Sequence, residues 1–91
     1  MKKKINFIVE SSYNELKNIN KKIKKKYSLK IILKGKFSEF DSVDLITFFS
    51  ILDNKFIENQ LIIPEFFDDQ FFFKYNNINI KDLINYISEK I

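Results

Sequence analysis

The segment Asp41-Ser42-Val43-Asp44-Leu45 holds the residue types best placed for chemistry in this chain. Asp41 or Ser42 can cap a helix, and Asp44 complements the helix dipole in its first turn. The apolar residues that follow recur at helical steps, namely Leu45, Phe49, Leu52 and Phe56. A serine at a helix start can carry a phosphate ester, because the amide donors and the dipole tolerate negative charge there. Ser42 is therefore a candidate functional residue, although Asp-Ser before an apolar helical run is also the pattern of an ordinary helix N-cap.

The composition excludes most catalytic chemistry. The 91 residues include no His and no Cys, which leaves no disulfide, no zinc site, no nucleophile paired with histidine and no imidazole acid-base catalysis. We predict that the protein is not an enzyme. A chain of this length closes one hydrophobic core, so residues 1–91 are expected to form a single domain.

The N-terminus resembles a signal peptide only in its first residues, which include three lysines. The apolar run from Ile5 to Val9 is interrupted by Asn6 and ends at Glu10, so it is too short for export. No stretch approaches the roughly 20 apolar residues that a membrane-spanning helix needs. We expect a cytoplasmic protein with no membrane association.

Charge is divided between the two parts of the chain. Residues 1–36 hold twelve lysines and two acids, whereas residues 37–91 hold four lysines and ten acids. The basic run at residues 21–26 contains lysine without arginine, which supplies charge but lacks the bidentate geometry used to read bases. We therefore expect a solvated surface there and no nucleic-acid partner. The rival hypothesis, a basic nucleic-acid-binding protein, predicts salt-sensitive binding.

The N-terminal third of the chain allows two interpretations. A mostly apolar set of residues recurs at steps of three and four, which fits one long amphipathic helix, namely Ile5, Ile8, Val9, Ser12, Leu16, Ile19, Ile23 and Tyr27. Alternatively, Lys4 to Glu10 forms a strand and Ser12 opens a new helix through a capping box with Glu15. Ser28 to Gly35 is a strand or a packed loop.

Two more helices are expected in the C-terminal third. Pro64 is well placed to begin a short one that runs to Asp69. A last helix starts near Asn79 with apolar residues along one face, namely Ile80, Leu83, Ile84, Ile87 and Ile91.

The stretch from Glu39 to Ile46 resembles the attachment-site signature of acyl carrier proteins, whose Asp-Ser-Leu motif opens the second helix of a four-helix bundle. Ile62-Ile63-Pro64 is similar to the segment before the family's short third helix, and residues 78–87 are similar to its last helix. The resemblance covers roughly residues 37–91. It implies an all-α, acyl-carrier-protein-like four-helix bundle.

The resemblance also implies a function and its partners. Ser42 would carry 4′-phosphopantetheine, and Asp41 would face the Mg²⁺-dependent phosphopantetheinyl transferase that installs it. The protein would be a monomer that holds an acyl or aminoacyl thioester for the enzymes of fatty acid, polyketide or nonribosomal peptide biosynthesis. Val43, Asp44 and Asp53 would dock these enzymes, whose basic patches would meet the acids of the carrier.

Several residues depart from the family pattern. Glu39 stands where the family usually has Gly, and Val43 stands where Leu is commonest. Thr47, Asn54 and Lys55 replace acids often found along the second helix, which indicates an unusual set of partners.

The alternative fold uses the strand interpretations of the first part of the chain. It is a small α/β interaction module of the STAS type, with a βαβ unit and with Ser42 as a helix cap or phosphoswitch.

Overall fold

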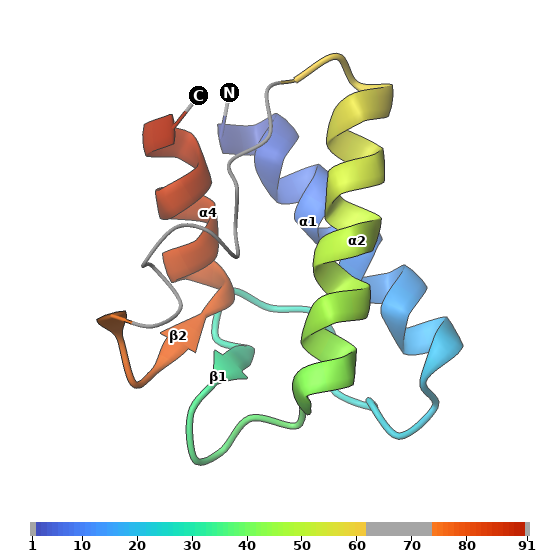
Figure 1. Ribbon diagram of the computed structural model, residues 1–91, viewed down its shortest axis with the longest axis vertical. Helices are drawn as coiled ribbons and strands as arrows, with labels where there is room; N and C mark the ends of the chain where they lie inside the picture. The colour runs from blue at the N-terminus through green and yellow to red at the C-terminus, as the bar shows by residue number, and fades with distance from the viewer. Residues whose placement is uncertain (1, 62–73, 91) are drawn as a thin grey trace.

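A computed structural model describes residues 2–61 and 74–90 and shows a chain that is mostly helical (Figure 1). Three helices and two very short strands make up the described secondary structure. In chain order they are α1 (Lys2–Ile19), β1 (Ile32–Lys34), α2 (Ser42–Glu58), β2 (Ile78–Asn79) and α4 (Ile80–Lys90).

The interpretation of the N-terminal segment as one continuous helix is confirmed. α1 includes residues 4–10, so the alternative strand at that place is wrong. The buried residues of α1 follow helical spacing, namely Ile5, Ile8, Val9, Ser12, Tyr13 and Leu16. Ser12 is fully buried, and its hydroxyl is satisfied by donating to the Ile8 carbonyl at 2.8 Å.

α1 ends earlier than its apolar pattern predicts. Ile19 is 64% exposed. Ile23 is buried, but it belongs to the loop that follows α1 and not to the helix. The Asn20 side chain accepts a hydrogen bond from the Lys22 N–H at 3.1 Å, a local bond that competes with helix continuation. The lysines that follow would also repel one another along a helix.

A two-stranded antiparallel sheet joins the connection between α1 and α2 to the segment before α4. Ile32 lies opposite Asn79 and Lys34 lies opposite Ile78, with an irregularity between the two pairs. The predicted strand within residues 28–35 is therefore present but short. Among residues 2–61 and 74–90 this antiparallel pair is the whole sheet, so the βαβ unit of the α/β alternative is wrong there.

α4 begins where the sequence predicts. Asn79 and Asp82 form a reciprocal pair, in which the Asp82 N–H donates to Asn79 Oδ1 at 2.8 Å and the Asn79 N–H donates to Asp82 Oδ2 at 3.0 Å. The first amides of the helix donate to the connection between α1 and β1, from Ile80 to the Ile31 carbonyl at 2.9 Å and from Lys81 to the Leu29 carbonyl at 3.1 Å. These donors at the start of α4 are thus already occupied.

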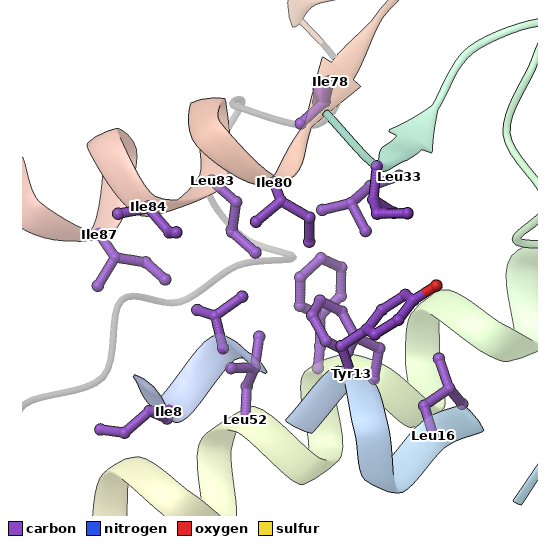
Figure 2. Packing of buried hydrophobic residues seen from close by; sticks show 14 of the residues in the cluster. Ile8, Tyr13, Leu16, Leu33, Leu52, Ile78, Ile80, Leu83, Ile84 and Ile87 are labelled. Atoms are coloured by element: carbon purple, nitrogen blue, oxygen red, sulfur yellow. The ribbon is translucent and has the colours of Figure 1, made fainter. Parts of the chain in front are cut away.

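The core lies between the three helices. α1 packs against both α2 and α4, and Figure 2 shows Leu83 and Ile87 of α4 pointing toward Ile8 of α1 and Leu52 of α2. All four side chains are buried, and each contributes roughly 1.5–3 kcal/mol through burial of apolar surface. Of the predicted face of α2, Phe49, Leu52 and Phe56 are buried, together with Phe48, which the pattern missed.

Some predictions lie outside the described residues. The short helix expected from Pro64 to Asp69 and the match at residues 62–64 are among them. Within the described ranges, no helix has both the length and the apolar character needed to cross a membrane.

Gly35 provides the first test of this fold. Its φ of +141° lies in a region that L side chains rarely adopt, and an added Cβ would collide with the Asn77 side chain. We expect Gly35→Ala to lower the free energy of unfolding by at least about 1 kcal/mol, measured by urea denaturation. Lys36→Ala, at the neighbouring exposed position, is the control and should have little effect. Equal stability of both variants would contradict the described turn.

Candidate functional site

The first turn of α2 is held by a capping box made of two aspartates. Asp41 is the N-cap residue, with φ −93° and ψ −177°. Its Oδ1 accepts a hydrogen bond from the Asp44 N–H at 2.8 Å, and Asp44 Oδ2 accepts one from the Asp41 N–H at 3.1 Å. Both carboxylates lie at the positive end of the helix dipole, where negative charge is stabilising.

Ser42 is the first residue of α2 and is exposed. Asp41 performs the capping, so the interpretation of Ser42 as the helix cap is wrong. Within the described ranges, the Ser42 hydroxyl makes no hydrogen bond. The serine is therefore not needed to start the helix, and its hydroxyl is open to chemistry.

The backbone around Ser42 also has unused donors. Among the described residues, neither the Ser42 N–H nor the Val43 N–H has a hydrogen-bond partner, as expected for the first amides of a helix. The start of α4 differs, because its Ile80 and Lys81 amides donate to loop carbonyls. Of these two helix starts, only that of α2 presents free amides beside an exposed hydroxyl.

Asp44 does not occupy the exposed docking position expected from the sequence. It is only 7% exposed, and its Oδ1 accepts a hydrogen bond from Asn20 Nδ2 at 2.7 Å. The prediction that Asp44 offers a charge to partner enzymes is wrong, because capping and the contact with Asn20 draw its carboxylate inward. Asn20, at the end of α1, is a site residue that the sequence pattern missed.

Asp53 is also withdrawn from the surface. It is half-buried, and its Oδ1 is buried without a hydrogen-bond partner in the described part of the chain. Burial raises the pKa of the Asp53 carboxyl above its ordinary value. Asp53 is thus a poor candidate for a freely exposed docking charge.

The outer face of α2 is an uncharged stripe of exposed residues. Val43 is 69% exposed and Ile46 is 54% exposed, and Ile57 lies further along the same face. Ser50 and Asn54, between them in the sequence, are exposed as well. We call these five residues the α2 stripe. Val43 therefore has the exposure that its predicted docking role requires.

The lysine-rich run at residues 21–26, here called the lysine segment, lies beside the start of α2. Asn20, which precedes it, bonds to Asp44, and Lys25 Nζ lies 3.6 Å from Glu39 Oε1. The Tyr13 hydroxyl donates to the Lys25 carbonyl at 2.6 Å, which anchors the segment to α1. Five of its six residues are exposed lysines. The sequence gives no direct sign of this position, because the contacts join residues distant along the chain.

The described residues contain no candidate metal-binding cluster. No group of three or more His, Cys, Asp or Glu side chains is placed to hold a metal ion in those ranges. An open groove of about 440 Å³ along α1, lined by Phe7, Glu10 and Asn14 among others, does not include Ser42. The arrangement around Ser42 is suited to presenting an attached group and not to enclosing a substrate.

No family model, curated protein or solved structure matches this chain. The function must therefore be inferred from the site itself, which consists of an exposed serine at a capped helix start, an uncharged stripe and a neighbouring lysine segment.

The capping box predicts a contrast between adjacent substitutions. Asp41→Ala should lower the free energy of unfolding by about 1 kcal/mol, because the Asp44 amide loses its acceptor. Ser42→Ala should change the free energy of unfolding by less than about 0.5 kcal/mol, because Ser42 is exposed and its hydroxyl makes no hydrogen bond to the described residues. Chemical denaturation of both variants measures the difference. A larger loss from Ser42→Ala would show that Ser42 has a structural role.

Asp53 predicts a pH-dependent stability difference. Folding raises the pKa of Asp53 above the ordinary Asp value of about 3.9. Between these two pKa values the folded protein binds more protons than the unfolded chain. The free energy of unfolding therefore falls as pH rises from the ordinary value through the raised one. Asp53→Asn should therefore raise Tm at pH 7, and the difference should shrink below about pH 4. Glu58→Gln, an exposed change of equal charge on α2, is the control. A Tm gain that is independent of pH would contradict this interpretation.

Proposed function

We propose that this protein is a carrier of the acyl carrier type, with 4′-phosphopantetheine attached to Ser42. The observation that carries the proposal is the exposed Ser42 hydroxyl, free of described hydrogen bonds, on the first residue of a 17-residue helix. A residue kept for capping would have its side-chain oxygen engaged by the helix amides. Here Asp41 does that work.

The surroundings of Ser42 suit a phosphodiester. Two unpaired amides, from Ser42 and Val43, lie at the positive end of the helix dipole. They would stabilise the negative charge that attachment brings. The group itself supplies a thiol at the end of a long flexible arm, on which an acyl or aminoacyl thioester is held.

Asp41 fits the role of helper during attachment. Its Oδ1 accepts the Asp44 N–H, while its other carboxylate oxygen has no hydrogen-bond partner among residues 2–61 and 74–90. Asp41 is exposed beside Ser42. That oxygen is available to the Mg²⁺ of a phosphopantetheinyl transferase, since carboxylate oxygens are preferred ligands of this ion.

The order of the elements supports the same proposal. A first helix, a long connection, a second helix that opens at the serine and a final helix follow one another along the chain. This is the order of an acyl-carrier-type four-helix bundle, whose remaining short helix is a sequence prediction for residues 64–69, outside the described residues. We propose a cytoplasmic monomer that meets a phosphopantetheinyl transferase and acyl-loading or acyl-transferring enzymes.

Modification with coenzyme A tests the proposal. Incubated with coenzyme A, Mg²⁺ and a broad-specificity phosphopantetheinyl transferase, the protein should gain the mass of one phosphopantetheine group. Tandem mass spectrometry should place that group on Ser42. Ser42→Ala should abolish the gain, because the accepting hydroxyl is removed.

Ser50→Ala is the matched control, because Ser50 is a second exposed serine on α2 but lies within the helix. It should leave modification unchanged. Circular dichroism should show helical spectra for both variants, so that a loss of modification is not mistaken for unfolding. A folded protein that several transferases leave unmodified would overturn the carrier proposal.

A further inference from the structure

We propose that the enzymes that meet Ser42 present an apolar patch bordered by acidic side chains, and not the basic patch expected from the sequence. This inference rests on the carrier function proposed above. It concerns the surface around Ser42, because the exposed lysines of the lysine segment lie close to the start of α2.

The acids expected to dock a basic partner are withdrawn from the surface of α2. Asp44 is buried against Asn20, and Asp53 is half-buried. Asp41 is exposed, but its carboxylate caps the helix. The exposed acids next to Ser42 in the sequence are therefore Asp41 and Glu39, and Glu39 is paired with Lys25.

The exposed surface of α2 next to Ser42 is apolar. Ile46 lies one helical turn beyond Ser42 and is 54% exposed, and Val43 is adjacent and more exposed. Phe37, in the approach to α2, is 73% exposed. Large apolar side chains grouped at a surface mark contact sites for other proteins. The α2 stripe itself contributes no charge to such a contact.

Most of the exposed charge close to the start of α2 is basic. The lysine segment is fastened to the start of α2 by the bond from Asn20 to Asp44 and by the ion pair of Lys25 with Glu39. Lys36 adds a further exposed amine, with its Nζ 5.9 Å from the centre of the Phe37 ring. From residue 20 to residue 41 the chain holds eight lysines and two acids. Acidic side chains on a partner would complement this border.

A protein partner explains the combination better than a nucleic acid does. Phosphate backbones attract lysine, but they do not account for the exposed apolar side chains of Val43 and Ile46 beside Ser42. A protein patch with an apolar centre and a charged rim matches both features.

The test compares two transferases with opposite charge at the carrier-binding cleft. One has a cleft bordered by acidic residues, and the other is its variant with those acids replaced by lysine. At low ionic strength, we expect the acidic enzyme to modify Ser42 with a kcat/KM about tenfold higher. The difference should shrink as salt is added, because exposed charges are screened.

Two charge-reversal variants locate the effect. Lys21→Glu with Lys22→Glu should lower kcat/KM with the acidic enzyme by about tenfold. Lys3→Glu with Lys4→Glu makes the same change in net charge at the opposite end of α1, away from the start of α2 (Figure 1). It should change kcat/KM by less than about twofold, since screening weakens distant charges. Circular dichroism of both variants checks that they remain folded.

The outcomes separate the two proposals. Modification of Ser42 that is faster with the lysine-bordered enzyme, or equal losses from both charge-reversal variants, would overturn the inference while leaving the carrier function intact. Failure of both enzymes to modify Ser42 would overturn the carrier function and this inference with it. Salt-sensitive binding to a labelled DNA or RNA oligonucleotide, lost in the Lys21/Lys22 variant, would assign the surface to nucleic acid and overturn the inference.

Discussion

The carboxylate of Asp44 joins the end of α1 to the start of α2, and the arrangement around Ser42 depends on it. One of its oxygens accepts the Asp41 N–H and the other accepts the Asn20 side chain. A carboxylate that is only 7% exposed must have such partners, because an unpaired buried charge is costly. The same interaction therefore fixes where the helix begins, where the serine lies and where the lysine segment runs.

The fold could be predicted well where it depends on local patterns. The steps of three and four from Ile5 through Ile8 and Ser12 to Leu16 locate α1. The capping signals at Asp41 and Asn79 locate the starts of the later helices. Spacing also identifies much of the core of α2. Both kinds of signal act over one or two helical turns, so the residues needed to recognise them are close together in the sequence.

The site was less predictable because its environment is not local. In the sequence Asp44 looks like a docking acid, and only its contact with Asn20, the residue after α1, reveals that it is buried. In the same way, the pairing of Lys25 with Glu39 places a basic segment next to a region counted as acidic. The ion pair of Lys55 with Glu15, at 3.0 Å, places a further lysine and a further acid between α2 and α1. A count of charged residues along the chain does not show which side chains are exposed and which are paired with an opposite charge.

The antiparallel pairing of β1 with β2 has a consequence for cooperativity. The pairing joins residues far apart in the sequence, so forming it costs chain entropy. The paired segments are also short. With the bonds from Ile80 and Lys81 to loop carbonyls, it anchors the start of α4 through few peptide groups. The start of α2 is attached to α1 by separate contacts. The β1–β2 pair and the first turn of α4 can therefore open locally with their own rate of amide hydrogen exchange, while Leu83 and Ile87 keep the rest of the helix packed in the core.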